Sequence, residues 1–460
     1  MTTLGRSVEE IAAAIASGEI SAAEAATVHL DALARVDKEL NAVARLEPEA
    51  AAAAAAEKDA AAASTGPLHG VPLAHKDIYG RAAWLHEAGS AVLAGNRAAV
   101  TSSSLTSLDE AGALDIGRLN TVEFALGPAG LNDITGAVKN PWNTEHITGG
   151  SSSGSGACVA AGAVPAALGS DTGGSIRLPA AACGVVGIKP TAGRIGRTGV
   201  FPAAGSLDTV GPLATTVRDA AILLEVMCRH DPADPQSVDL PAPGPLATIE
   251  DGLAGLTIGV AREYFFDPVT TAVGAALEGV ISLTEREGGA LSDVAFPDIA
   301  LTNRFTMAII GAEAAAVHRP WIETRAAQYG PQTLERLVAG LFIPASAYIA
   351  ALHQRHAALA AALDGPFAAV DVVLVPAIPF EVPKITDPSM NAEMIGYTTR
   401  PFNYLGLPCM VIPIGVDGAG LPIAVQLVAR PFEEATLLRA ARALERALAF
   451  RESHTPGITA

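Results

Sequence analysis

Two glycine-rich segments carry the residues whose types and spacing could do chemistry. The first reads GGSSSGSG from Gly149 to Gly156, and the second reads GSDTGGSIR from Gly169 to Arg177. Glycine loses more backbone freedom on folding than other residues, so a fold uses it where the chain turns sharply or approaches another group closely. One expected helix and one expected strand separate the two segments, which could therefore face each other across a pocket.

The second segment has the features of a nucleophile site. Thr172, Gly173 and Gly174 have little side-chain bulk, so their backbone N–H groups could converge as an oxyanion hole. Ser175 follows them and is placed for acyl transfer. From the spacing alone, a glycine-rich turn with a solvent-facing serine stays open as the alternative.

Three other interpretations of these segments compete with this one. The GxSxG motif from Gly150 to Gly154 would make Ser152 the nucleophile of an α/β-hydrolase-like esterase, but residues 143–148 are too polar for the apolar strand that must precede it. The D-T-G sequence at Asp171 matches half of an aspartic-protease pair, and no second D-[TS]-G occurs. Neither common phosphate-loop consensus appears in the context that it needs. These three interpretations are therefore disfavoured, while the role of Ser175 stays open at this point.

The longer pattern resembles a known family. Gly149–Arg194 resembles the signature sequence of the amidase signature enzymes nearly residue for residue, and GVPLAHKD at 70–77 resembles the family segment that carries a catalytic lysine. The other matching segments are GRLNTVEFA at 117–125, with Arg118 and Leu119 as departures, PFNYLGLP at 401–408 and GLPIAVQLVAR at 420–430. The likeness covers most of the chain and is weakest across about 230–400.

This resemblance implies a Ser–cisSer–Lys triad. It places the nucleophile at Ser175, the bridging serine with its cis peptide bond at Ser151, and the base at Lys76. It also places the oxyanion hole at the backbone amides of 172–174. A lysine is a base only when neutral, so its pKa must fall from about 10.4 towards 7–8, which burial can achieve. Neutral Lys76 would then take a proton from Ser175 through Ser151 and return it to the leaving amine.

Other residues of the matched motifs have supporting roles. Gly149 and Ala125 are the candidate substrate-binding residues, and the resemblance implies that Asp171 and Arg177 hold the loops together. His75 is an alternative base next to Lys76. Successive strand side chains point to opposite faces, so we expect His75 to point away from the site.

Composition narrows the class of protein. Thirty basic against 48 acidic residues give a net charge of −18, which disfavours nucleic acid and anionic membranes as partners. No apolar run is long enough for a spanning helix and the N-terminus has no signal-peptide pattern, so we expect a cytoplasmic protein. The histidines show no metal spacing, and we expect neither metal nor cofactor. The resemblance suggests a homodimer. The cysteines, which we expect to be small buried core residues, are Cys158, Cys183, Cys228 and Cys409.

The elements that must position these residues alternate between helices and strands. Capping boxes at Ser7 and Ser21 start two helices, and 48–64 reads as a third. Expected strands are Gly70–His75, Val164–Gly169, Gly184–Ile188, Leu256–Val260, Val370–Val375, Met410–Val416 and Pro422–Val428, and expected later helices are Gly156–Gly162, Val217–Cys228 and Glu433–Phe450. This order predicts one large α/β/α sandwich with a mixed, twisted sheet. We expect one amidase domain over 1–460, with N-terminal helices at 1–65, the signature core at about 66–230 and a variable helical region at about 265–400.

The resemblance implies an amidohydrolase that cleaves a C–N bond other than a peptide bond. Apolar stretches at Phe305–Ile310, Leu341–Ile343 and Met394–Tyr397 favour an uncharged amide, anilide or carbamate (urethane), with aryl esters also possible, if they line the pocket rather than pack in the core. Met390–Tyr397 reads as a mobile loop over the entrance. The alternative is the glutaminase subunit of a tRNA amidotransferase. It is disfavoured because Leu178, and not that subunit's usual glutamine, follows the signature arginine.

Overall fold

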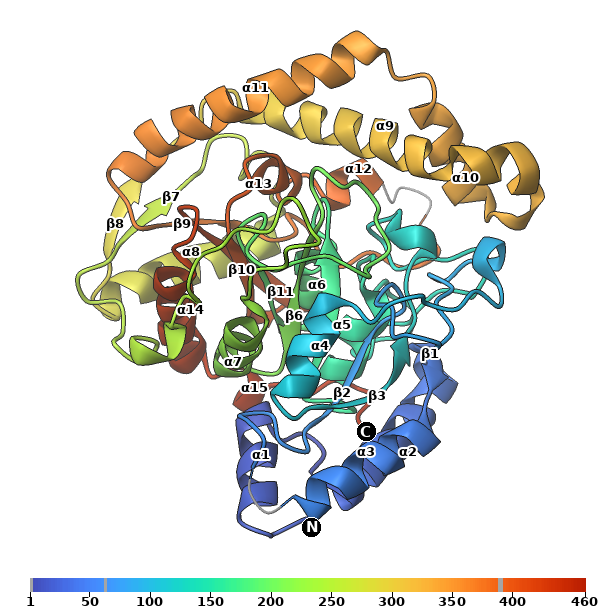
Figure 1. Ribbon diagram of the computed structural model, residues 1–460. Coiled ribbons are helices and arrows are strands. Elements are labelled where there is room, and N and C mark those ends of the chain that lie inside the picture. Colours follow the sequence, from blue (N-terminus) through green and yellow to red (C-terminus); the bar gives the residue numbers. More distant parts are fainter. Residues whose placement is uncertain (1–2, 62–63, 388–391) are drawn as a thin grey trace.

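A large mixed sheet forms the centre of the molecule (Figure 1). The computed structural model describes residues 3–61, 64–387 and 392–460, and within them the sheet has 11 strands in the order β1-β3-β2-β4-β6-β5-β10-β11-β9-β7-β8. The strands are β1 Val43–Leu46, β2 Pro72–Lys76, β3 Leu114–Leu119, β4 Ala166–Asp171, β5 Val186–Lys189, β6 Thr209–Ala214, β7 Thr257–Val260, β8 Ala290–Asp293, β9 Val372–Pro376, β10 Cys409–Val416 and β11 Pro422–Ala429.

Helices cover both faces of this sheet (Figure 1). They are α1 Val8–Ala16, α2 Ala22–Leu40, α3 Pro48–Ala60, α4 Ser103–Glu110, α5 Ser153–Ala160, α6 Arg177–Cys183, α7 Val217–Met227, α8 Thr271–Arg286, α9 Ile299–Arg325, α10 Pro331–Gly340, α11 Ala345–Asp364, α12 Ala392–Ile395, α13 Arg400–Tyr404, α14 Glu434–Leu448 and α15 Phe450–Ser453. The predicted sandwich of a mixed sheet between helical layers is confirmed.

Strand alternation divides the core into two layers. In β10, Met410 and Ile412 join the cluster that α4, α7, α8 and α14 cover, whereas Val411 joins the cluster under α2, α3, α5 and α6. β2 follows the same rule, with Leu73 in the first layer and Ala74 in the second. Because side chains two positions apart share a face, Lys76 belongs to the layer of Ala74 and His75 to the layer of Leu73.

The N-terminal helices begin where their capping boxes predict. Ser7 and Ser21 each accept a hydrogen bond from the backbone N–H three residues on, and the glutamates at those positions bond back to the cap. The third helix starts at Pro48 as predicted but ends at Ala60, short of residue 64. Residues 62–63 of that prediction lie outside the described part of the chain.

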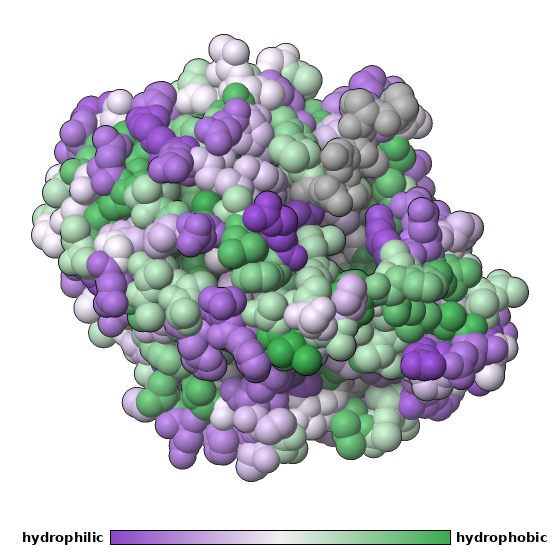
Figure 2. Space-filling model, turned by 90° about the horizontal axis from the view of Figure 1, so that it is seen from above, coloured by the Kyte–Doolittle hydropathy of each residue, from purple (hydrophilic) through white to green (hydrophobic). Residues whose placement is uncertain are grey.

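An outer layer of α9, α10 and α11 lies above the sheet (Figure 1). α9 and α11 close a third apolar cluster that includes Phe265, Phe296 and Phe402. The outward side of the layer is itself apolar in places, as Figure 2 shows from above. Its most exposed large hydrophobic side chain is Phe342, at 78%, which follows α10.

Two further features belong to this region. In the described residues, no single helix is both long and apolar enough to cross a membrane, although the bent pair α10 and α11, at 84°, meets that length and composition together. The predicted loop at Met390–Tyr397 is wrong in part, because Ala392–Ile395 forms the short helix α12. Met390 lies outside the described residues.

Candidate active site

Lys76 ends β2, an inner strand of the sheet, and is fully buried. Its Nζ donates to Ser151 Oγ at 2.7 Å and to Ser170 Oγ at 2.8 Å. β2 lies between β3 and β4, and its parallel pairing with β4, with His75 opposite Leu168, brings the Ser170 end of β4 beside Lys76. Two serines that lie 75 and 94 positions further along the chain therefore meet the lysine in one buried contact.

Burial lowers the pKa of Lys76 from 10.5 to about 7. The nearby carboxylates of Asp208 and Asp171 act in the opposite direction and favour the charged amine. Both direct partners of Nζ are neutral hydroxyls, which compensate a buried positive charge less than a carboxylate would. A substantial fraction of the lysine is therefore a neutral amine near pH 7.

Ser151 is held by a loop from elsewhere in the chain. The Gly150–Ser151 peptide bond is cis, as the resemblance implied. The Ser151 carbonyl accepts from Val122 N at 3.2 Å and from Thr121 Oγ1 at 2.9 Å. The segment 117–125 that resembled a family loop therefore positions the backbone on which the bridging serine sits.

Ser175 lies at the wall of a cavity of about 420 Å³, a size common for small-molecule sites. The carbonyl of Ser175 accepts from Ser152 N at 3.3 Å, which ties the two glycine-rich segments together. Among the contacts of the described residues there is no hydrogen bond between the hydroxyls of Ser151 and Ser175. Such contacts are often long without substrate and tighten when substrate binds.

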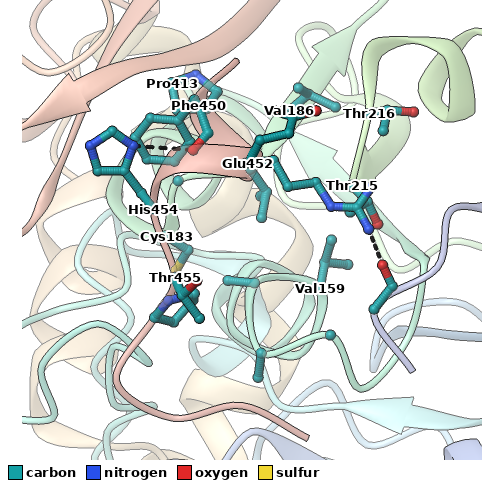
Figure 3. Close-up of a pocket in the computed structure, with 18 of the residues that line it drawn as sticks. Val159, Cys183, Val186, Thr215, Thr216, Pro413, Phe450, Glu452, His454 and Thr455 are labelled. Carbon is teal, nitrogen blue, oxygen red and sulfur yellow. Dashed lines mark hydrogen bonds between the residues drawn. The ribbon is translucent and has the colours of Figure 1, made fainter. Parts of the chain in front are cut away.

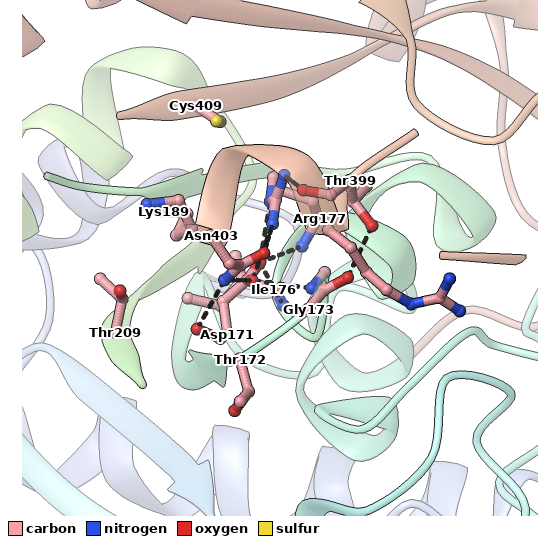
Figure 4. A network of polar contacts seen from close by, with 12 residues as sticks. Asp171, Thr172, Gly173, Ile176, Arg177, Lys189, Thr209, Thr399, Asn403 and Cys409 are labelled. Carbon is pink, nitrogen blue, oxygen red and sulfur yellow. Dashed lines mark hydrogen bonds and ion pairs between the residues drawn. The ribbon is translucent and has the colours of Figure 1, made fainter. Parts of the chain in front are cut away.

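The loop before Ser175 is built around a buried ion pair, shown in Figure 4. Arg177 donates to both carboxylate oxygens of Asp171 at 2.9 Å. It also donates to Gln426 Oε1 at 2.6 Å and to Asn403 Oδ1 at 2.5 Å, which connects the loop to β11 and α13. Burial by itself would raise the pKa of Asp171, but the Arg177 guanidinium outweighs it and holds that pKa well below its usual range. This geometry agrees with the loop-holding role expected for the pair.

The Asp171 carboxylate also accepts a hydrogen bond from one of the three backbone N–H groups expected in the oxyanion hole. Gly174 N donates to Asp171 Oδ1 at 2.8 Å, and Gly174 is absent from the described lining of the cavity. Thr172, Gly173 and Ser175 do line it. Their N–H groups have no acceptor among the described residues. The amide of Ser175 itself, which sequence analysis did not consider, is thus better placed than that of Gly174.

The other candidate residues separate in space. Ala125 lines the cavity, but Gly149 does not, and a Cβ on Gly149 would lie 2.7 Å from the Leu178 carbonyl oxygen. His75 is buried on the far side of β2, near Asp115 and Tyr79, where burial lowers its pKa to about 3. The expectation that His75 points away from Lys76 agrees with this placement.

Ser152 is not available as a nucleophile. It is fully buried, and its Oγ lies 3.3 Å from both the N and the O of Ser170. It does not line the cavity that contains Ser175. These contacts argue against the alternative of an esterase that uses Ser152, because its hydroxyl joins the glycine-rich segment to β4.

Part of the variable region lines the cavity, as the sequence allowed. Met307 and Ile310 come from α9, Ile343 follows α10, and Gly396 precedes α13. Leu178 and Leu337 complete an apolar wall. Two arginines, Arg336 and Arg400, also lie in the lining.

A larger cavity, of about 550 Å³, lies elsewhere and contains none of these residues (Figure 3). Its lining includes Cys183, Thr215, Phe450 and His454. Among the described residues, no group of three or more His, Cys, Asp or Glu side chains could hold a metal ion. All four cysteines are buried and free, as expected.

A mixed sheet between helical layers holds a buried lysine at the end of an inner strand beside two serine-bearing loops, an arrangement suited to hydrolysis through a serine nucleophile. The chain belongs to the amidase signature family. The family model named Amidase matches residues 24–438.

Relatives and solved structures give the same family. The chain is 37% identical over 406 residues to a glutamyl-tRNA(Gln) amidotransferase subunit from Chloroflexus aggregans, an alignment that covers 83% of each chain. The fold also matches a solved structure described as a vestigial protein complex that reveals the evolutionary origins of an s-triazine catabolic enzyme. The matching chain of that complex is 31% identical to this chain, with a TM-score of 0.91, and the match covers 99% of this chain and 100% of that chain. A bacterial aryl acylamidase of the amidase signature family is 25% identical, with a TM-score of 0.90 over 98% and 97%.

Proposed function

We propose that this amidohydrolase cleaves an uncharged amide, anilide or carbamate through an acyl-enzyme on Ser175. The observation that carries the proposal is the contact between a buried Lys76 and Ser151, at 2.7 Å, behind the loop that presents Ser175 to the cavity. A serine hydroxyl is a weak nucleophile and needs a base, and a lysine with a pKa of about 7 can be that base near neutral pH.

In the proposed reaction, Ser151 relays protons between Lys76 and Ser175. As Ser175 Oγ attacks the carbonyl carbon, its proton passes to Ser151 Oγ and the Ser151 proton passes to Lys76 Nζ. The relay runs backwards to protonate the leaving nitrogen, and the C–N bond breaks. Water then attacks the ester and loses its proton by the same route, which frees the acid and restores Ser175.

The oxyanion formed in each half of the reaction needs hydrogen-bond donors that are already in place. The N–H groups of Thr172, Gly173 and Ser175 are our candidates, because they lie at the cavity wall and have no acceptor among the described residues. Gly174 is left out of this set because its N–H is bonded to Asp171. Each donor aimed at the oxyanion contributes about 10²–10³ in rate in comparable enzymes.

The cavity favours an uncharged, largely apolar substrate. Leu178, Met307, Ile310 and Leu337 supply apolar contact, and no Asp or Glu side chain is part of its described lining. Arg336 donates to the Leu126 carbonyl at 2.6 Å. This contact directs the guanidinium towards the loop rather than leaving it wholly to the substrate.

The glutaminase subunit of a tRNA amidotransferase is a second candidate, and the 37% identity to an amidotransferase chain favours it. Glutamine carries an α-ammonium group as well as a carboxylate. The described lining has no acidic side chain to pair with the ammonium group, which makes the cavity a poorer fit for glutamine.

Hydrolysis of a panel of five substrates tests both candidates: an aliphatic amide, an anilide, an aryl carbamate, an aryl ester and glutamine. We expect turnover of an uncharged substrate, and a loss of more than about 1,000-fold in Ser175→Ala and Lys76→Ala. Lys38→Ala, at an exposed lysine of α2, is the matched control and should keep wild-type activity. Undiminished turnover in Ser175→Ala would refute the mechanism, and a preference for glutamine would establish the second candidate.

A further inference from the structure

We propose that Ser170 exchanges the proton of Lys76 with water in a second chamber, separate from the substrate cavity. The inference rests on the proposed function, in which Lys76 is the base. It adds a residue and a route that the triad does not contain.

The chamber lies beside β4 and β6 and has a volume of about 220 Å³. Its lining includes Ser170, Arg197, Phe201 and Asp208. A water occupies about 30 Å³ in the liquid, so the chamber has room for several. Its rim reaches the protein surface, because three of its lining residues are exposed: Pro202, Ala233 and Pro235. Water from solvent can therefore enter it.

The chamber and the substrate cavity have almost entirely different described linings. Ser175 lines the cavity, Ser170 lines the chamber, and Ala203 is the one residue common to the two described linings. Lys76 Nζ donates to two hydroxyls, to Ser151 at 2.7 Å and to Ser170 at 2.8 Å, and of these two serines Ser170 lines the chamber. A bound substrate would close the substrate cavity to water but would leave the chamber lined by Ser170 open to water.

A serine hydroxyl can accept one hydrogen bond while it donates another, which is what a proton relay requires. In the proposed step, an N–H bond of the Lys76 ammonium breaks and its proton joins Ser170 Oγ. The original Ser170 O–H bond breaks at the same time, and that proton joins a chamber water, which carries it to solvent. Lys76 is left as a neutral amine, Ser170 is unchanged, and the reverse sequence protonates the lysine.

The need for such a route follows from the charge state of the lysine. Because the pKa of Lys76 is lowered to about 7, a substantial fraction of the lysine is protonated near pH 7 and cannot act as the base. A substrate that binds to this protonated fraction would be held unproductively unless the proton can leave on another side. Ser170 is the hydroxyl that offers that exit among the described contacts of Lys76 Nζ.

The charged groups around the route are compatible with it. Asp171 and Asp208 are the carboxylates whose charge acts on Lys76, and Asp171 is committed to Arg177. Asp208 accepts from Thr172 Oγ1 at 2.6 Å and from Ala203 N at 2.9 Å. Arg197, on the chamber side, pairs with Asp234 at 2.8 Å. The charge of Asp208 thus attracts a proton towards the chamber. Its hydrogen bonds to Thr172 and Ala203 hold the segments that lie between the chamber and the substrate cavity.

Thiol labelling tests whether the chamber opens separately from the substrate cavity. Ser170→Cys would be treated with a small methanethiosulfonate, with and without prior sulfonylation of Ser175 by phenylmethanesulfonyl fluoride, and the adducts located by mass spectrometry. The four native cysteines are buried, so wild type supplies the background. We expect the labelling rate of Ser170→Cys with Ser175 blocked to lie within twofold of the rate with Ser175 free. Labelling that falls more than tenfold when Ser175 is blocked would overturn the separate route.

Kinetics test whether Ser170 moves the proton. We expect Ser170→Ala to lower kcat by at least tenfold around pH 7 while KM stays within twofold, with partial recovery at pH 9, where the lysine is already neutral. Ser170→Thr keeps the hydroxyl and should restore most of kcat. Ser155→Ala is the matched control, since Ser155 is also buried but its hydroxyl bonds the Leu168 carbonyl at 3.0 Å.

Two outcomes separate this inference from the proposed function. A Ser170→Ala enzyme with wild-type kcat at every pH, beside an inactive Ser175→Ala, would overturn the role of Ser170 and leave the triad intact. An active Ser175→Ala would instead overturn the proposed function on which the inference rests.

Discussion

At the scale of single residues, the site contains two fully buried basic side chains whose surroundings differ. Arg177 has a carboxylate partner in Asp171 and two amide oxygens, so its charge is compensated. Lys76 has only the hydroxyls of Ser151 and Ser170 as direct partners among the described residues, so burial favours its neutral form. The same burial therefore makes Arg177 a fixed structural charge and Lys76 a base.

The pH dependence of kcat/KM should follow this lysine. The pKa of Lys76 is lowered to about 7. The active neutral form is therefore lost as the pH falls through 7, and nearly all of the lysine is neutral well above pH 7. We expect kcat/KM for a neutral substrate to rise about tenfold per pH unit below 6.5 and to level off above 8. A profile that is flat from pH 5.5 to 8.5, measured on a substrate that does not itself ionise, would contradict this assignment.

At the scale of elements, α9 and α10 cross at two glycines and place one wall of the cavity. A Cβ on Gly340 would collide with the Gly311 carbonyl oxygen and would lie 3.0 Å from Ala315 Cβ. Gly311 and Gly340 themselves line the cavity, together with Ile310 and Ile343. The close approach of these helices thus determines how wide the substrate cavity is on this side.

Gly340→Ala should consequently change substrate affinity and stability together. The added methyl group must push α10 away from α9, so we expect KM to rise several-fold and the free energy of unfolding to fall by about 1–3 kcal/mol. Gly279→Ala in α8 is the control, because its Cβ would meet no atom within 4 Å and alanine favours the helix by about 0.5–1 kcal/mol. Equal stability of the two variants in denaturant titrations would show that the contact is unimportant.

The strands that the sequence did not predict were missed for two reasons. β3 and β6 are buried at every position, yet they read LDIGRL and TVGPLA, with Gly, Pro or charged residues inside. Neither alternation nor a continuous apolar run marks such a strand. β1 and β8 are four residues each, too short for a pattern. The strands with plain apolar runs, such as β9 and β11, were predicted to within two residues at each end.

At the scale of the whole molecule, one sheet extends from β1 to β8 and joins the signature core to the last strands. β5 pairs with β10, whose residues lie more than 200 positions further along the chain. The division into N-terminal helices at 1–65, a core at about 66–230 and a variable region at about 265–400 stays a prediction. Exposed large apolar side chains gather at the end of α10 and directly after it, at Val338, Leu341 and Phe342. Figure 2 shows apolar patches on the face seen from above.

The homodimer that the resemblance suggested also stays a prediction, and solution mass tests it. We expect light scattering after size-exclusion chromatography to give twice the chain mass of 46.6 kDa at micromolar concentration. The net charge of −18 opposes association, so raising the salt from 50 to 500 mM should strengthen the dimer. A mass of one chain under both conditions would refute it.

The amino-acid sequence by itself determined the family, the mixed α/β architecture and the residues proposed as the triad. Glycine-rich loops and their flanking strands are patterns of neighbouring residues, so they can be recognised directly in the sequence. Only the tertiary structure decided that the Gly174 amide is bonded to Asp171, that Ser152 is committed to β4, and that Ser170 contacts Lys76. These contacts depend on which strands are neighbours and which way each N–H and hydroxyl points. Spacing along the chain does not encode either, because long-range packing sets both.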